Sequence, residues 1–429
     1  MNDDALRNLL AQGLSEEEMA RALLDLTLEA APPDVADAVR MCALPAWFDA
    51  AHLALLADKS EREAADLVEQ VAAFSFTLPR ERGGYVYHES TRARLLDWWR
   101  KPEQAGRFAM LSERLARHYL ALAREQDPRL SGSDYLDALA VLDAAYPNVY
   151  AAWEGAVASE HWELVRDFAY AQADYQDKRG LWLETQTWAR KGLEACERLD
   201  DEAGRADMQI ILGNAYSDLP TGDREANLQQ AIECYREALR FRTPEAAPLD
   251  YAMTQNNLGT AYSDLPTGDR EANLQQAIEC YTAALQIEHL APHDQAMYHR
   301  NRASSLIDLN RLDEAKQDCE QARTLAPDHH YTHARLGQLA FAHDDYAAAV
   351  EHYTSAIERQ EEAGFYFDRG LAHLALGHQD DALADYQFAF PLADSITVAE
   401  AMEELEKFAV EHPDTPGLEV IRALFPSSS

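Results

Sequence analysis

The sequence lacks any run of about 18 or more apolar residues, the length that a helix needs to cross a bilayer. Its start also lacks the basic segment and the apolar segment that together form a secretory signal. We therefore expect a cytoplasmic protein with no membrane partner. The 429 residues, 47 % of them hydrophobic, suffice for a sizeable core divided over two or three structural units.

Basic residues are scarce in this chain. It has 38 lysines and arginines against 75 aspartates and glutamates, which gives a formal net charge of −37. A field of that sign repels phosphate backbones and anionic lipids, so nucleic acid is not expected as a partner. A solvated acidic surface explains most of the charge, and a basic protein partner is the alternative.

Cysteine is rare, odd in number and widely spaced, and the sequence has no C-x-x-C motif. Neither disulfides nor a zinc site is therefore predicted. We expect the cysteines to serve as small apolar packing residues. They are Cys42, Cys196, Cys234, Cys280 and Cys319.

Catalytic motifs are missing as well. There is no G-x-x-x-x-G-K-[ST] loop for phosphates, no G-x-S-x-G and no H-E-x-x-H. The densest histidine cluster is His329, His330 and His333, and it lacks the further ligands and supporting shell that a metal site requires. We expect no catalytic residues, no metal and no cofactor.

The sequence does contain an internal repeat. Residues 215–235, AYSDLPTGDREANLQQAIECY, return unchanged at 261–281, a period of 46 residues. A period of this order indicates stacked supersecondary units. The second half of each block has apolar residues at helical spacing, which predicts a helix with one buried face. Recent duplication explains the identity better than a repeated binding surface in the loop, because solenoids grow by copying whole units.

Further along the chain the period shortens. Ala303, Gly337 and Gly370 open successive units at steps of 34 and 33 residues. Small residues recur at helical spacing in all three units, with a tyrosine between them in the second and third and a closing proline, Pro327, in the first. This pattern resembles the tetratricopeptide repeat, and the 46-residue units resemble its variety with an inserted loop in bacterial STAND and CHAT proteins. The resemblance implies an all-α fold, a right-handed α-solenoid of helix pairs.

In tetratricopeptide repeats the first helix of each pair lines the concave groove. By that resemblance, six side chains are candidates for binding a peptide, since amides and guanidinium groups can hydrogen-bond a peptide backbone or a carboxylate. The alternative is that each is an ordinary polar surface residue. The candidates are Asn214, Asn256, Thr260, Arg300, Ser304 and Gln338.

The N-terminal part has a different pattern. Ser15 and Ser60 open capping boxes ahead of helices, and a helix is expected to start near Trp47. FSFTLP and YVYHES alternate in strand fashion around the turn-rich RERGG, which predicts a hairpin. Helices followed by a hairpin resemble the winged-helix segment of STAND signalling NTPases. In that family a histidine after the second strand can sense phosphate, and His88 stands there; a packing or hydrogen-bonding role is the alternative that we favour.

Four segments follow from these patterns. Residues 1–130 form a helical and winged-helix-like module, 131–205 degenerate helical repeats, 206–394 the tetratricopeptide solenoid, and 395–429 a capping helix and tail. The helix in the last segment is expected to begin with a capping box at Thr397 and Glu400. The aromatic residues between 135 and 199 lie at helical spacing, which favours core packing over a ligand platform.

We therefore predict a non-enzymatic scaffold or regulatory subunit that binds a protein or peptide. The resemblance implies a bacterial signalling or defence system with an effector enzyme or ATPase on another chain. One alternative is a nucleotide-regulated subunit that completes a partner's ATP site. Another is a winged-helix transcriptional regulator, although the recognition-helix candidate 60–73 is acidic, the wrong charge for DNA.

Overall fold

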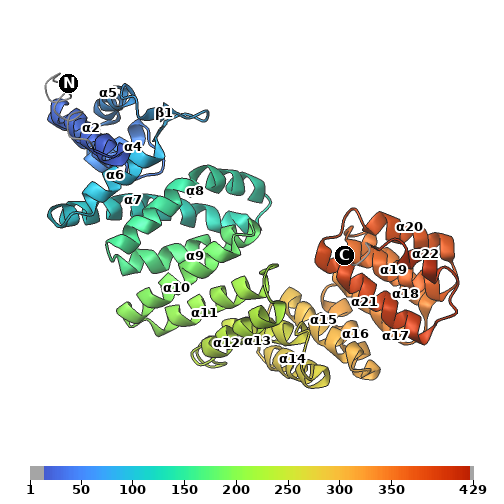
Figure 1. Cartoon of the computed structure of the whole chain (residues 1–429). Helices are drawn as coiled ribbons and strands as arrows, with labels where there is room; N and C mark the ends of the chain where they lie inside the picture. The colour runs from blue at the N-terminus through green and yellow to red at the C-terminus, as the bar shows by residue number, and fades with distance from the viewer. Residues whose placement is uncertain (1–13, 426–429) are drawn as a thin grey trace. The chain divides into compact units, whose positions relative to one another are not determined.

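The structure is a computed structural model that describes residues 14–425 (Figure 1). The chain divides into two compact units, the first ending at Ala215 and the second beginning at Tyr216. Across the described residues the fold is helical apart from one two-stranded sheet, which confirms the predicted all-α class with a small hairpin. No helix within residues 14–425 combines the length and apolarity that crossing a membrane requires.

Short helices and the hairpin open the first unit. Both predicted capping boxes form, with the Ser15 and Ser60 side chains accepting from the backbone N–H groups of Glu18 and Glu63. The elements are α2 (Glu16–Ala30), α3 (Pro33–Met41), α4 (Ala50–Ala57), α5 (Glu61–Ala72), β1 (Thr77–Pro79), β2 (Tyr85–Tyr87) and α6 (Glu89–Trp99).

The predicted helix at Trp47 begins three residues later than expected. Phe48 instead pairs with Tyr85 beside the hairpin, with the two backbone N–H···O distances at 2.9 and 2.8 Å. Asp49 then caps α4 by accepting from the N–H of His52. The predicted first residue of this helix was wrong because Phe48 is held in an extended conformation by its backbone hydrogen bonds to Tyr85, which is distant in the sequence.

Longer helices complete the first unit. Trp153 and Trp188, from two of them, stack with ring centroids 4.5 Å apart and are both buried, which confirms core packing for these two members of the aromatic series. The elements are η1 (Pro102–Gln104), α7 (Ala105–Gln126), η2 (Asp127–Ser131), α8 (Tyr135–Ala158), α9 (Trp162–Lys178), α10 (Trp182–Leu199) and α11 (Glu202–Ser217), which runs past the unit boundary.

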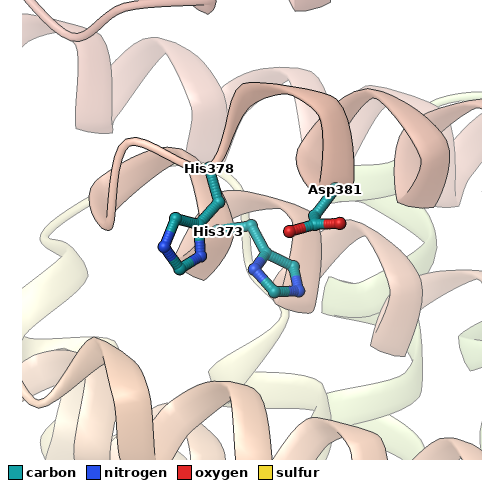
Figure 2. Close-up of side chains that lie close together, drawn as sticks. All are labelled: His373, His378 and Asp381. Carbon is teal, nitrogen blue, oxygen red and sulfur yellow. The ribbon is translucent and has the colours of Figure 1, made fainter.

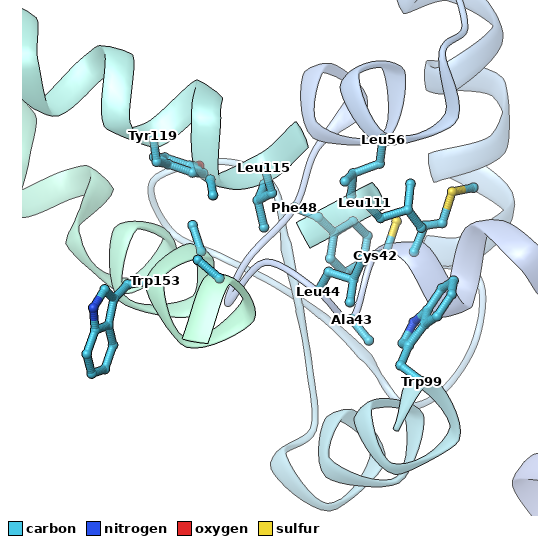
Figure 3. Packing of buried hydrophobic residues seen from close by; sticks show 14 of the residues in the cluster. Cys42, Ala43, Leu44, Phe48, Leu56, Trp99, Leu111, Leu115, Tyr119 and Trp153 are labelled. Carbon is cyan, nitrogen blue, oxygen red and sulfur yellow. The ribbon is translucent and has the colours of Figure 1, made fainter. Parts of the chain in front are cut away.

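A buried asparagine joins α8 to the N-terminal helices. Asn148 has no exposed surface; its Oδ1 accepts from the Trp47 N–H at 2.9 Å, and its Nδ2 donates to the Trp47 carbonyl at 3.0 Å. Nδ2 also lies 2.7 Å from the Tyr119 hydroxyl and 3.0 Å from His52 Nε2. Around this network Phe48, Leu111 and Leu115 belong to one apolar core (Figure 3).

Helix pairs build the second unit. Cys280 and Cys319 are buried between these helices, as expected for packing residues. The elements are α12 (Arg224–Ala238), α13 (Pro248–Ser263), α14 (Arg270–Leu285), α15 (Pro292–Asp308), α16 (Leu312–Leu325), α17 (His330–Ala342), α18 (Tyr346–Ile357), α19 (Ala363–Ala375), α20 (Gln379–Ala389), α21 (Ser395–Glu411) and α22 (Leu418–Arg422).

The small and aromatic residues of the repeats lie where the two helices of a pair pack together, and their sizes match. A β-carbon added to the glycine would come within 2.7 to 2.9 Å of a tyrosine ring in each of three pairs: Gly259 with Tyr281, Gly337 with Tyr353, and Gly370 with Tyr386. In the pair formed by α15 and α16 the corresponding residues are Ala303 and Cys319, in one apolar cluster. A tyrosine therefore goes with glycine, and the smaller cysteine leaves room for alanine.

The duplicated loop is fixed by its own side chains. Gly222 and Gly268 have φ of 87° and 90°, a left-handed conformation that favours glycine. Asn227 donates to the Thr221 carbonyl at 3.0 Å, and Asn273 repeats the bond in the second copy. Much of the loop's identity therefore serves structure.

The arginine in each loop also reaches the next repeat. Arg224 donates to the Ser217 carbonyl and lies 3.4 Å from an Asp264 carboxylate oxygen. Arg270 donates to the Ser263 carbonyl and lies 2.9 Å from Asp308. Each loop thus contacts its own helix and the following pair.

The terminal helix α21 does not begin with the predicted capping box. Asp394 is the N-cap instead, and its carboxylate accepts from the Thr397 N–H at 2.8 Å. Aspartate is a stronger N-cap than threonine, and Asp394, three residues upstream, starts the helix earlier. Leu405 and Phe408 of α21 are buried in one cluster with residues of α19 and α20, so the helix covers the last pair.

Candidate functional site

The six side chains predicted to bind a peptide lie in both units. Asn214 is half-buried on α11 in the first unit. The other five belong to the second unit, on the first helices of consecutive pairs. Asn256 and Thr260 lie on α13, Arg300 and Ser304 on α15, and Gln338 on α17.

Asn256 and Thr260 already have hydrogen-bond partners inside the array. Asn256 is only 5 % exposed, and its Oδ1 accepts from Asn301 Nδ2 at 2.9 Å, a bond between α13 and α15. The Thr260 hydroxyl lies 3.2 Å from both the Asn256 carbonyl and the Tyr281 hydroxyl. These contacts tie neighbouring helices together.

Arg300 is in a different position. Its side chain is 7 % exposed, and within the described part of the chain its Nη1 has no hydrogen-bond partner. Burial, together with the nearby positive charge of Arg335, lowers the pKa of Arg300 to about 10. The guanidinium is still charged at neutral pH, and a buried charged donor without an acceptor can gain from a ligand oxygen.

Beside Gln338 lies an acidic pocket of about 600 Å³ between α17, α19 and α21. Arg335 donates from Nη1 to Gln338 Oε1 at 2.6 Å and forms part of its wall. The other lining residues include three aromatic residues, Tyr331, Phe365 and Phe367. The carboxylates that line this acidic pocket are Glu361, Glu362, Asp368, Asp394, Glu400 and Glu404.

Six carboxylates against one arginine make the acidic pocket strongly negative. Burial raises the pKa of Asp368 well above its ordinary value, and the carboxylates of Glu404 and Glu400 add to the shift. The pKa of Glu404 is also raised, because the surrounding protein limits its hydration. Like charges that crowd in this way favour a bound cation.

Sequence reasoning missed Arg335 and Asp368. They occupy one equivalent position in successive first helices, where α13 and α15 have Asn257 and Asn301. The sequence alone shows that this repeat position is asparagine in α13 and α15, arginine in α17 and aspartate in α19. This change to charged residues is the signal that could have located the acidic pocket. The six predicted candidates occupy positions on either side of it.

His88 lies at the end of β2, in the N-cap position of α6. Its Nδ1 is 3.1 Å from the Ser90 hydroxyl, and the ring is exposed. It lines a cavity of about 370 Å³ together with Leu23 and Leu24 of α2 and Phe76 of the hairpin.

The three histidines of the H-H-x-x-H cluster have separate partners. His329 Nδ1 accepts from the Tyr331 N–H at 3.3 Å, and His330 Nε2 lies 3.5 Å from Glu362. His333 Nε2 lies 3.0 Å from the Pro327 carbonyl. Burial, followed by the positive charge of Arg300, lowers the pKa of His329 to about 4.

Comparison with known proteins agrees with the repeat assignment. The family model described as tetratricopeptide repeat matches residues 301–329, which cover the end of α15 and all of α16. A curated relative, the DnaJ homolog subfamily C member 7 homolog of Dictyostelium discoideum, is 29 % identical over 115 residues. The match covers 27 % of this chain and 21 % of that protein.

Solved structures that resemble this chain include a tetratricopeptide repeat protein from Parabacteroides merdae. It is 17 % identical, with a TM-score of 0.42, over 62 % of this chain and 98 % of that one. Another is pilF of Pseudomonas aeruginosa, 18 % identical with a TM-score of 0.40, over 57 % of this chain and 99 % of that one.

The family match identifies a tetratricopeptide repeat at residues 301–329. Stacked helix pairs of this kind form a scaffold that is typical of protein–protein interaction.

Proposed function

We propose that the chain is a non-catalytic interaction subunit whose second unit binds a protein or peptide carrying a lysine or arginine side chain. The acidic pocket carries this proposal, since its wall has six carboxylates and a single arginine. A cation of about the size of a lysine head would fill part of the space and neutralise the crowded negative charge. The rest of the peptide would extend over the first helices.

Neighbouring side chains suit the backbone of the same peptide. Within residues 14–425 Arg300 has a buried donor without a partner, which suits a carbonyl or carboxylate oxygen, and Gln338 lines the acidic pocket with a side-chain amide that can donate. Ser304 lies one helical turn from Arg300 on α15. The net charge of −37 would steer a basic partner toward the chain.

Peptide binding tests this proposal. A fluorescein-labelled peptide with lysine and arginine at alternate positions is compared with a peptide that has glutamine there, by fluorescence anisotropy. The basic peptide should bind, and the double variant Asp368→Asn, Glu404→Gln should weaken it about tenfold or more. Glu403→Gln, one residue along α21 and paired with Lys407 outside the acidic pocket, is the matched control.

Binding that is unchanged in the double variant, or equally weakened by Glu403→Gln, would contradict the proposed pocket. In that case attraction to the overall negative charge would account for binding. Equal affinity for the two peptides would show that the chain does not recognise a lysine or arginine side chain.

We propose further that this subunit serves an effector enzyme or ATPase on another chain, in a bacterial signalling or defence system. The support is the resemblance of both parts of the sequence to such systems. In this scheme 1–130 is the regulatory module, 131–205 the degenerate helical repeats, 206–394 the binding solenoid and 395–429 its cap. Co-purification with the product of a neighbouring gene, with loss of the complex in the pocket double variant, is the expected result.

A second role concerns the first unit. Short helices followed by a hairpin support a winged-helix module, and the exposed His88 at the rim of a 370 Å³ cavity could contact a phosphate of a partner's nucleotide. Calorimetry with ATP, on the chain alone and with its partner, tests this role. A heat of ATP binding that appears only in the complex and is lost in His88→Ala would support this role. No heat of binding, either with the chain alone or with the complex, would exclude it.

A further inference from the structure

Three side chains gather at the turn between α19 and α20. His373 lies near the end of α19, His378 in the N-cap position of α20, and Asp381 in the first turn of α20 (Figure 2). One ligand atom from each, an imidazole nitrogen or a carboxylate oxygen, lies within 4.8 Å of the other two. His378 and Asp381 are exposed, and His373 is half-buried.

The repeat fold does not require these residues. In the pair α15 and α16 the corresponding positions are Leu306, Arg311 and Glu314, and in α17 and α18 they are Ala340, Asp345 and Ala348. Asp345 caps α18 by accepting from the Ala348 N–H, whereas His378 makes no side-chain capping bond to α20. Neither Arg311 nor His378 makes a side-chain capping bond, so helix capping does not explain the histidine of the last pair.

The two nitrogens of His373 differ in their surroundings. Nδ1 is buried, and within the described residues it has no hydrogen-bond partner. Nε2 lies 4.0 Å from an oxygen of Asp385, whose carboxylate accepts from Arg369 at 2.9 and 2.6 Å. At 4.0 Å these two groups are near each other but not hydrogen-bonded, and a small shift of the ring would bring Nε2 to the fixed carboxylate that orients many metal-bound histidines.

We propose that His373, His378 and Asp381 bind one divalent transition-metal ion of the zinc class. Two imidazoles and one carboxylate favour zinc and its neighbours over magnesium or calcium, which prefer oxygen ligands. Tetrahedral bonds of about 2.0–2.2 Å place ligand atoms about 3.4 Å apart. Rotation of the exposed His378 and Asp381 side chains would shorten the distances between ligand atoms from within 4.8 Å to about 3.4 Å. A water molecule would be the fourth ligand.

Such an ion would join the end of α19 to the start of α20. It would hold the last turn of the array closed and stabilise the pair that α21 covers. The competing explanation is that Asp381, with Asp380 beside it, only complements the positive end of the α20 dipole. That explanation predicts no affinity for zinc at this turn.

Zinc titration of the full chain separates the two explanations. The protein is treated with a chelator, dialysed, and titrated with zinc chloride by calorimetry, and its thermal unfolding is followed with and without the metal. One ion should bind per chain and raise Tm. His378→Ala and Asp381→Asn should each weaken this binding about tenfold or more while leaving Tm without metal nearly unchanged.

His343→Ala and His329→Ala are the controls. His343 is exposed in the turn of the preceding pair, and His329 belongs to the H-H-x-x-H cluster. Both variants should bind zinc as the parent chain does. Absence of binding, or binding that His378→Ala and Asp381→Asn leave intact, would overturn the proposal, as would loss of the same site in His329→Ala.

Discussion

Gly337 on α17 lies against the ring of Tyr353 on α18, so closely that a β-carbon on the glycine would stand 2.9 Å from two ring carbons. Real β-carbons essentially never approach other atoms so closely, and the tyrosine is buried, with 2 % of its surface exposed. The helices of this pair therefore meet at a distance that only glycine permits.

Gly337→Ala should lower the free energy of unfolding by about 1–3 kcal/mol, the usual cost of overpacking. Urea unfolding followed by circular dichroism measures the change. Gly364→Ala on α19 is the control: no neighbour lies within 4 Å of the added carbon, so the helix should be unchanged or stabilised by up to about 1 kcal/mol. If Gly337→Ala leaves the free energy of unfolding unchanged, the glycine is not needed for the contact with Tyr353.

Adding Tyr353→Cys to Gly337→Ala copies the Ala303 and Cys319 combination of the preceding pair. Because the cysteine leaves room for the new methyl group, the double variant should lose less stability than the two single changes added together. A coupling of about 0.5–3 kcal/mol is expected. Strict additivity would mean that the glycine and the tyrosine act independently.

Asp318 should stabilise the pair α15 and α16 through its ionised form. Arg302 donates to both of its oxygens at 2.7 Å, and His299 Nδ1 lies 2.7 Å away. Asp318→Asn is expected to cost about 1.5–3 kcal/mol at neutral pH. Asp97→Asn removes a pair with Arg100 that is more than half exposed, and should cost less than about 1 kcal/mol.

The loss in Asp318→Asn should depend on pH. Burial opposes ionisation of Asp318, but the hydrogen bonds from Arg302 and His299 outweigh it and lower the pKa. A lowered pKa stabilises the fold above the unfolded value of about 3.9 and loses that effect as pH falls further. The parent and variant should therefore converge below about pH 4, and a constant gap down to pH 3 would argue against the ion pair.

Asn148→Ala should weaken the first unit by about 1–3 kcal/mol, because it removes the buried amide that pairs with the partly buried N–H and carbonyl of Trp47. Hydrogen exchange gives a specific readout, since the Trp47 amide should exchange faster. Gln230→Ala, at an exposed helical site in the second unit, should change stability by less than about 0.5 kcal/mol. Unchanged exchange at Trp47 would contradict the assigned bond.

The acidic pocket should reduce stability while it is empty. The pKa values of Asp368 and Glu404 are raised, so their ionisation at neutral pH costs free energy in the folded chain. Asp368→Asn and Glu404→Gln should each raise Tm at pH 7, and the gain should vanish below about pH 4, where the carboxyls are protonated in both states. Glu403→Gln should give no gain, since its bond to Lys407 lowers its pKa.

A fall in Tm for both pocket variants would mean that these carboxylates support the fold. A gain in Tm combined with weaker peptide binding is the pattern expected of a binding site, which trades stability for function.

The sequence predicted the helix pairs because their packing is local. Gly259 and Tyr281, for example, lie 22 residues apart and meet wherever two helices are joined by a short loop. The capping boxes at Ser15 and Ser60 were predicted for the same reason, and the one at Thr397 failed because Asp394 competes within the same turn.

The candidate sites depend on contacts that no local pattern contains. The acidic pocket needs α21 opposite α17, so that Glu404 approaches Arg335 from a helix about seventy residues away. Similarly, His373, His378 and Asp381 have no ligand spacing of a single helix, and only the geometry of the turn brings them together.

The arginines of the duplicated loops have a consequence for the length of the array. Arg224 reaches Asp264 in the following copy, and Arg270 reaches Asp308 in the unit after it. The 46-residue copy therefore carries both an arginine that pairs with the next unit and an aspartate that pairs with the unit before it. An additional copy inserted between them would find both partners in place, so this part of the protein can be extended without designing a new interface.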